Sequence, residues 1–181
     1  MSIKITYFVH GTTTDNEAEL SSGWNNVELS ERGRKQSAEL TNMTKQHHFD
    51  VVFTSDLSRA FTSAHITWGD TYKIIRDSRL RECNYGDYNG KPSGIVEPLQ
   101  EKSIRTPMPN GESYEQVKTR VADFLDELRK NYDGKHIAIV AHKAPQLALD
   151  VLLRGMTWEE AFTNDWRKTK QWQPGWEYTL S

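Results

Sequence analysis

The sequence predicts an α/β domain, a three-layer αβα sandwich around a mostly parallel sheet. Apolar, β-branched segments typical of buried strands alternate along the chain with longer segments of helical periodicity. The strand candidates lie at 3–9, 50–55, 72–77 and 136–141. The chain has 181 residues and contains no internal repeat, heptad run or interdomain linker composition. We therefore expect a single domain that spans residues 1–181.

Three strands and two helices are predicted in the first half of the chain. Residues 3–9, IKITYFV, are β-branched and aromatic and run into a polar turn, which is typical of a buried strand that ends in a loop. Ser30 is a candidate N-cap for a helix over 31–47, in which Gly33 is the unfavourable residue. The other expected elements are an apolar strand at 50–55, a helix from about 57 to 67 and a strand at 72–77.

The second half of the chain contains the clearest helix and strand patterns. Ser113 and Gln116 form a capping-box pattern. The apolar residues behind it that share one helical face are Val117, Val121, Phe124, Leu125 and Leu128. The segment HIAIVA at 136–141 predicts a buried strand, and Pro145 suits the first turn of a helix that follows it.

Two segments lack this periodicity. Residues 84–112 are rich in Gly, Pro, Asn and Ser, so we expect a long loop excursion, and loops of this length are usually functional or disordered. The C-terminal tail is expected to pack against the domain because it contains four tryptophans, namely Trp158, Trp166, Trp172 and Trp176.

The composition argues against several classes of partner and site. Lys and Arg total 23, Asp and Glu total 25, and the net charge is -2, so no bulk charge attracts nucleic acid or an anionic membrane. No apolar run approaches the ~20 residues of a membrane span, and the N-terminus lacks a signal-peptide core. Cys83 is the only cysteine, which excludes an internal disulfide framework and a cysteine-rich zinc site. We expect a cytoplasmic protein with neither nucleic acid nor membrane as its partner.

Three polar residues lie just beyond the ends of predicted strands. His10 follows the first strand, Arg59 follows the second, and His142 follows the strand at 136–141. Each residue alone is unremarkable, because a histidine at a strand end is usually structural and a lone arginine is usually a surface charge. Ligands of parallel α/β sheets bind beyond the carboxyl ends of the strands. Three groups that can carry positive charge there indicate an anionic ligand, and phosphate is favoured because Arg offers a planar donor fork.

These residues belong to a series of motifs that resemble those of a known family. The motifs are Val9-His10-Gly11-Thr12-Thr13-Thr14-Asp15-Asn16, Ser55-Asp56-Leu57-Ser58-Arg59-Ala60, Leu80-Arg81-Glu82 followed by Tyr85-Gly86-Asp87-Tyr88-Asn89-Gly90, Gly111-Glu112-Ser113, and Ala141-His142-Lys143. In this order, over residues 3–152, the chain resembles the histidine phosphatase superfamily, the phosphoglycerate mutase-like group. Two positions depart from the family pattern: Val9 replaces an arginine and Lys143 replaces a glycine.

The resemblance implies a role for each catalytic residue. His10 is the expected nucleophile, which attacks phosphorus and forms a phosphohistidine while its other ring nitrogen donates to a backbone carbonyl. Arg59 and His142 are expected to bind the phosphoryl oxygens. Glu82 is the expected general acid and then general base. The competing interpretation of Glu82 is an ion pair with Arg79 or Arg81. No metal or cofactor is expected.

Substrate-binding roles are implied for four more residues. Asn16 is expected to donate a hydrogen bond to the phosphoryl group, although a turn role is an alternative, and Gly11 and Thr13 of the same motif are expected beside it. Val9 removes a positive charge next to His10, and we hypothesise that Lys143 replaces that charge. The alternative is that Lys143 points to solvent or to a helix C-terminus and that the site is weakened.

The resemblance favours a metal-independent phosphatase that hydrolyses a small phosphomonoester through a phosphohistidine. Mutase activity is less favoured, because the mutases of the family are longer chains with extra segments around the site, whereas this chain is short. The alternative is a catalytically weak or inactive pseudo-phosphatase that binds a phosphorylated ligand, which Val9 favours and the retained catalytic residues oppose. An ordinary nucleotide-binding domain is disfavoured because no glycine-rich phosphate loop occurs. Substrate specificity is expected from residues 88–112, with the C-terminal tail as a further candidate, and no pattern predicts an oligomeric state.

Overall fold

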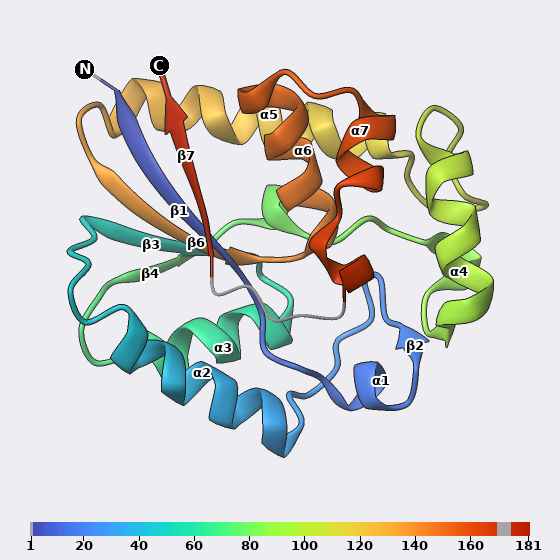
Figure 1. Cartoon of the computed structure of the whole chain (residues 1–181), viewed down its shortest axis with the longest axis horizontal. Coiled ribbons are helices and arrows are strands. Elements are labelled where there is room, and N and C mark those ends of the chain that lie inside the picture. The colour runs from blue at the N-terminus through green and yellow to red at the C-terminus, as the bar shows by residue number, and fades with distance from the viewer. Residues whose placement is uncertain (1, 170–174) are drawn as a thin grey trace.

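A five-stranded sheet forms the centre of the protein in the computed structural model, which describes residues 2–169 and 175–181 (Figure 1). The strand order is β4-β3-β6-β1-β7. The parallel strands are β1 (Ile3–Val9), β3 (Val51–Thr54), β4 (Ile74–Arg76) and β6 (His136–Ala141), and β7 (Trp176–Leu180) is antiparallel to β1. A small second sheet pairs β2 (Leu20–Ser21) with β5 (Lys91–Pro92). The expected mostly parallel sheet is confirmed.

Helices cover both faces of the sheet. On one face lie α5 (Tyr114–Asn131) and α6 (Lys143–Arg154), with α7 (Trp158–Thr163) packed on α6, and on the other lie α2 (Glu31–Met43) and α3 (Ser58–Trp68) (Figure 1). Two short helices, α1 (Thr14–Glu17) and α4 (Ser93–Gln100), lie to one side of these layers. Single 3-10 turns occur at η1 (Ser78–Leu80), η2 (Gly86–Tyr88), η3 (Glu101–Ser103) and η4 (Trp166–Thr169). The three-layer arrangement is therefore confirmed.

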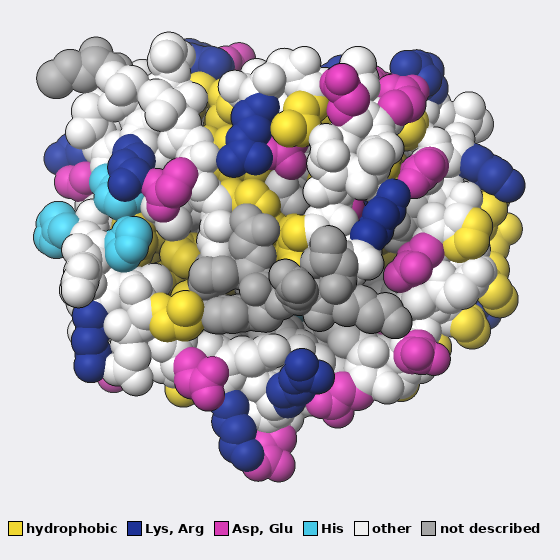
Figure 2. Space-filling model, viewed as in Figure 1, with side chains coloured by type: hydrophobic (Ala, Val, Ile, Leu, Met, Phe, Trp, Pro, Cys, Tyr) yellow, Lys and Arg dark blue, Asp and Glu magenta, His cyan; other side chains and the backbone are white. Residues whose placement is uncertain are grey.

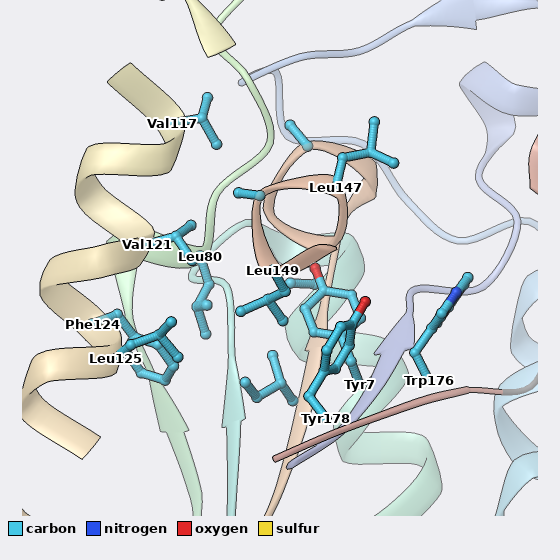
Figure 3. Close-up of a cluster of buried hydrophobic side chains, with 14 of the residues drawn as sticks. Tyr7, Leu80, Val117, Val121, Phe124, Leu125, Leu147, Leu149, Trp176 and Tyr178 are labelled. Atoms are coloured by element: carbon cyan, nitrogen blue, oxygen red, sulfur yellow. The ribbon is translucent and has the colours of Figure 1, made fainter. Parts of the chain in front are cut away.

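The hydrophobic core fills the space between the sheet and its helices. Five of the six residues of β6 are buried, as expected for a central parallel strand covered on both faces. Figure 3 shows Val121, Phe124 and Leu125 of α5 packed toward the sheet beside Leu80. These residues lie on the α5 face that the helical periodicity predicts.

Tyr7 connects the core to the end of β6. Its hydroxyl donates to the backbone oxygen of His142 (2.7 Å) and accepts from the His142 backbone nitrogen (3.0 Å). Both groups are buried, so this pair of hydrogen bonds fixes the backbone at the first residue after β6. The fold thereby sets the position of a predicted site residue.

The capping patterns in the sequence correspond to real helix starts. Ser113 and Gln116 form a reciprocal capping box at α5, and the Ser30 hydroxyl accepts from the Gly33 nitrogen at α2. α2 ends at Met43, earlier than expected, because Thr44 is already its C-cap. Gly33 is unfavourable for helix propensity, but a Cβ there would lie 1.9 Å from the Thr12 backbone oxygen. The close packing of the two segments thus requires glycine.

The segment 84–112 is more regular than the sequence predicts. It contains β5, α4 and two of the 3-10 turns, so the expectation of a loop without periodicity is wrong there. The eight residues of α4 include Pro98 and Gly94, which obscure the helical pattern in the sequence, yet Val96 and Gln100 are buried.

The tryptophans of the tail lie largely in the core. Trp158 and Trp176 are buried and Trp166 packs against the core at its edge, whereas Trp172 lies outside the described residues. Among the described helices, none combines the length and apolar character needed to cross a bilayer. On the face shown in Figure 2, basic and acidic side chains are interspersed.

Candidate active site

A cavity of about 680 Å³ collects most of the residues that the sequence singles out. Its walls come from the end of β1, the α1–β2 segment, α3, α4, the start of α6 and η4. The ionisable and polar side chains of the cavity wall include His10, Asn16, Arg59, Glu82, Lys143 and Arg167. Since β1, β3 and β6 run parallel, their carboxyl ends meet here, as expected for a ligand site of an α/β sheet.

His10 is held in one orientation by hydrogen bonds at both ring nitrogens. Its Nδ1 lies 2.7 Å from the Gly11 backbone oxygen, and a carbonyl can only accept, so Nδ1 carries the proton. Its Nε2 accepts from Arg59 Nε at 3.3 Å, a long and therefore weak hydrogen bond. His10 lines the cavity, and this weak bond must break before the Nε2 lone pair can attack an electrophile there.

The surroundings of His10 keep it neutral. Removal of the ring from water lowers its pKa from 6.5 to about 3, with a further contribution from the Arg59 charge, while the Gly11 carbonyl acts in the opposite direction. At neutral pH the imidazole is unprotonated. A neutral imidazole is the form that can act as a nucleophile or a base.

The low pKa of His10 predicts an acid-sensitive fold. Between pH 6.5 and pH 3 the unfolded chain binds a proton at His10 that the folded protein does not, so stability falls as the pH decreases through this range. We expect the His10 contribution to cost about 1–2 kcal/mol of unfolding free energy between pH 6.5 and 5. Urea unfolding at several pH values should show a smaller acid loss in His10→Gln. Parallel stability curves for the two proteins would contradict this prediction.

Arg59 is buried and linked to a neighbouring loop. It is 3% exposed, and its Nη1 and Nη2 donate to the backbone oxygens of Asn25 (2.9 Å) and Gly23 (2.7 Å). Burial lowers its pKa, but an arginine stays charged in proteins. Arg59 therefore places a permanent positive charge beside His10.

His142 lies directly beside His10 and is fully buried. The two ring centroids are 5.1 Å apart. Burial and the Arg59 charge hold the pKa of His142 well below its usual value. Neither Nδ1 nor Nε2 has a hydrogen-bond partner among the described residues. Buried polar nitrogens are normally paired, but the His142 ring itself does not line the cavity.

Glu82 is held at the N-terminus of α6. Its Oε1 accepts from the backbone nitrogens of Cys83 (2.8 Å) and Ala144 (3.0 Å), and its Oε2 accepts from that of Lys143 (3.2 Å). A carboxylate at a helix N-terminus satisfies free N–H groups there. Oε2 has the single, longer bond, so it is the oxygen with more freedom to exchange a proton.

The structure excludes the competing interpretation of Glu82. Arg79 pairs with Asp77 and Glu127 instead, and Arg81 pairs with Asp56 at 2.6 Å. Glu82 is buried and lines the cavity, so it is not a surface ion-pair residue.

Three residues of the first motif form hydrogen bonds within the protein. The Thr13 hydroxyl caps α1 and does not line the cavity, and the Gly11 nitrogen donates to Ser63 Oγ at 2.9 Å. These contacts replace the substrate contacts expected of Thr13 and Gly11. Asn16 lines the cavity, but its Oδ1 accepts from the Thr13 nitrogen (3.0 Å), which leaves its amide NH₂ to face a ligand.

Lys143 lies in the cavity wall and is already paired. Its Nζ is 3.0 Å from both Asp165 Oδ2 and Gln100 Oε1, and it lies 5.4 Å from the centre of the Phe162 ring. It does not point to solvent, since its side chain is only 19% exposed. The carboxylate of Asp165 balances much of its charge.

Sequence reasoning missed two charged residues of the cavity wall. Arg167 lies in η4, and Asp165 is the residue directly before η4. Both line the cavity. Their segment has no periodicity and no motif, so only the neighbouring tryptophan marked it. Thr12 was also missed: it lines the cavity, and its nitrogen and hydroxyl both donate to Gln36 Oε1 at 2.9 Å.

The fold and the cavity define an α/β protein with a site of histidine, arginine and carboxylate beyond the ends of parallel strands. The sequence matches the profile of the histidine phosphatase superfamily (branch 1) over residues 7–176. The chain belongs to this superfamily.

Similar proteins include both phosphatases and a mutase. The chain is 28% identical over 166 residues to phosphoserine phosphatase 1 of Hydrogenobacter thermophilus, covering 85% of this chain and 77% of that protein. It is 32% identical over 146 residues to a 2,3-bisphosphoglycerate-dependent phosphoglycerate mutase of Cytophaga hutchinsonii, covering 74% and 68%. Its structure resembles the α-ribazole phosphatase from Shigella flexneri with a TM-score of 0.79 and 25% identity, covering 88% and 84%. These similarities support histidine-phosphatase-type hydrolysis.

Proposed function

We propose that the protein is a metal-independent phosphatase that hydrolyses a small phosphomonoester through a phosphohistidine on His10. The observation that carries the proposal is the state of His10: it is neutral, its Nδ1 proton is bound to Gly11, and its Nε2 lone pair accepts only one long hydrogen bond, from the permanent cation Arg59. A nucleophile of this kind forms a covalent intermediate and divides the hydrolysis into two easier steps.

The first step transfers the phosphoryl group to the enzyme. The His10 Nε2 lone pair forms a bond to phosphorus, and the bond from phosphorus to the ester oxygen breaks. Glu82 gives a proton to the departing oxygen, so the alcohol leaves neutral. Arg59 and His142 stabilise the negative charge on the phosphoryl oxygens.

The second step returns the enzyme to its starting state. Glu82, now a carboxylate, accepts a proton from water while the water oxygen bonds to phosphorus. The bond from phosphorus to Nε2 breaks, which releases inorganic phosphate and restores the neutral histidine. The nucleophile and the charge-stabilising groups all come from side chains, so the proposed steps need no metal ion. The Asn16 amide is placed to contact the bound phosphoryl ester from the cavity wall.

A pseudo-phosphatase is the second candidate, and Val9 favours it. Val9 is partly buried in the cavity wall directly before His10, so the end of β1 contributes an apolar side chain instead of a cation there. Such a protein would bind a phosphorylated ligand and turn it over poorly. It has no need for the precise arrangement of His10 and Glu82, which is why we favour the enzyme.

The test is a screen of phosphorylated metabolites and p-nitrophenyl phosphate, with and without a chelator. We expect release of inorganic phosphate that the chelator does not suppress and that His10→Ala abolishes. Phosphate binding without turnover would favour the pseudo-phosphatase. Loss of activity in the chelator would refute metal independence, and transfer of phosphate to a second alcohol without net release would indicate a mutase.

A further inference from the structure

Three buried nitrogen atoms near His10 have no hydrogen-bond partner among the residues that the structure describes. Two are the ring nitrogens of His142, and the third is Nη2 of Arg167. An unpaired buried donor is costly. Arginine cannot deprotonate, so its Nη2 can only donate. The group that satisfies it must supply acceptor atoms, and an anion does so best.

Arg167 faces the same cavity as His10 and carries its charge close to the reacting atoms. Arg167 is part of η4 and lines the cavity. Burial is the main reason for the low pKa values of His10 and His142, and the Arg167 charge contributes to both. A cation whose field reaches both histidines also attracts an anion that is bound between them.

Asp165 fixes the guanidinium in place. Arg167 Nη1 donates to Asp165 Oδ1 at 2.8 Å and to Gln146 Oε1 at 3.4 Å, and the Arg167 backbone nitrogen donates to the same Oδ1 at 3.1 Å. The Asp165 side chain is 1% exposed. Burial raises its pKa, but the Arg167 and Lys143 charges together more than offset this, so its pKa lies below the usual value. The carboxylate therefore remains ionised and orients one edge of the guanidinium, while Nη2 remains unused.

The other cations of the cavity wall have less to offer a ligand. Both Nη atoms of Arg59 donate to backbone carbonyls, and Lys143 forms an ion pair with Asp165 and donates to Gln100. Lys168 is exposed and pairs with Glu101 at 3.5 Å. Val9, next to His10, is apolar. Among these cations, Arg167 is the one with a buried nitrogen, Nη2, that has no hydrogen-bond partner among the described residues.

We propose that Arg167 is a substrate-binding residue whose Nη2 donates to an oxygen of the transferred phosphoryl group, and that Asp165 is its positioning residue. This inference rests on the proposed function and deepens it. The end of β1 supplies no cation at Val9, and the inference assigns that role to Arg167 of the C-terminal segment. The phosphoryl group then lies between Arg59 and Arg167, next to Nε2 of His10.

The test measures binding of inorganic phosphate by calorimetry together with hydrolysis of p-nitrophenyl phosphate. In Arg167→Gln we expect the Kd of phosphate to rise about 10–100-fold. We expect kcat/KM to fall by about 10²–10³-fold, the usual effect of removing one donor to developing negative charge. Arg167→Lys keeps a charge for Asp165 but lacks the second planar nitrogen, so an intermediate loss is expected.

Further variants separate charge, position and folding. Val9→Arg in the Arg167→Gln background supplies a guanidinium from β1 and should recover part of the phosphate affinity. Asp165→Asn should raise the Kd of phosphate about tenfold, with partial recovery in Asp165→Glu. The matched control is Arg129→Gln on α5, an exposed arginine that pairs with Asp126 outside the cavity wall, and it should match the parent.

Two results would overturn the inference. One is a phosphate Kd in Arg167→Gln within about twofold of the parent, with the loss appearing in Lys143→Ala instead. The other is a parent protein that binds no phosphate. Phosphate binding is measured without turnover, so a parent that binds phosphate through Arg167 but does not hydrolyse esters would refute the proposed function and leave this inference intact.

Discussion

His10→Ala is expected to lose at least about 10³-fold in kcat, because removal of the covalent nucleophile removes the whole two-step path. The structure supports this expectation through the fixed tautomer: Nδ1 is bonded to the Gly11 oxygen, and Nε2 has only one long contact, with Arg59. Among the described residues that line the cavity, no other is a histidine or a cysteine, and the Cys83 thiol is buried with a raised pKa. Phosphate release from p-nitrophenyl phosphate measures the loss.

The covalent intermediate gives this prediction a second, independent measurement. Parent protein quenched during turnover should carry a phosphoryl adduct that is labile in acid and stable in alkali, and His10→Ala should carry none. The matched control is His65→Ala, which removes an exposed histidine of α3. Unchanged turnover in His10→Ala, or an adduct on a residue other than His10, would contradict the mechanism.

Glu82→Gln is expected to slow hydrolysis of alkyl phosphates by about 10²–10⁴-fold, the usual contribution of general acid catalysis. Alkoxides need a proton in order to leave, whereas nitrophenolate leaves without one. The variant should therefore lose far less activity on p-nitrophenyl phosphate. The glutamine oxygen can still accept from the backbone nitrogens of Cys83 and Ala144, whereas its NH₂ cannot accept from that of Lys143. Loss of this one bond affects both substrates equally.

The comparison of the two substrates distinguishes a proton donor from a structural residue. An equal loss on both substrates would show that Glu82 acts only by holding the start of α6. Glu159→Gln provides the control, since Glu159 is an exposed carboxylate whose nearest ion-pair partner, Arg105, is also exposed. It should not change either rate.

Much of the fold follows from local patterns. The apolar segments at Ile3–Val9, Val51–Thr54 and His136–Ala141 became parallel strands, and the capping box of Ser113 and Gln116 opens α5 as expected. These features depend on residues within a few positions of one another, which is why periodicity and capping residues predict them.

The least regular segments were predicted least well. α4 was missed because Gly94 and Pro98 interrupt its pattern, and it forms because Val96 and Gln100 are buried by the rest of the fold. Tertiary packing overrode a weak local propensity at this position.

The sequence by itself determined the family motifs and the placement of His10 and His142 directly after strands, because strand ends are encoded locally. Arg59 lies in the first turn of α3, the helix that follows β3, and parallel strands bring these segments together. Only the tertiary structure decided which side chains face the cavity. It directs Thr13 to a helix cap and Thr12 to the cavity wall, although the two are adjacent in sequence.

The tertiary structure also decided how the cations of the cavity are used. Asp165 binds Lys143 on one oxygen and Arg167 on the other, so an ammonium and a guanidinium from distant segments share one buried carboxylate. Asp165 and Arg167 are near neighbours in the chain, but the contact of Asp165 with Lys143 joins positions far apart and leaves no period in the sequence. Such contacts arise because burial of charge requires a partner wherever the folded chain brings one within reach.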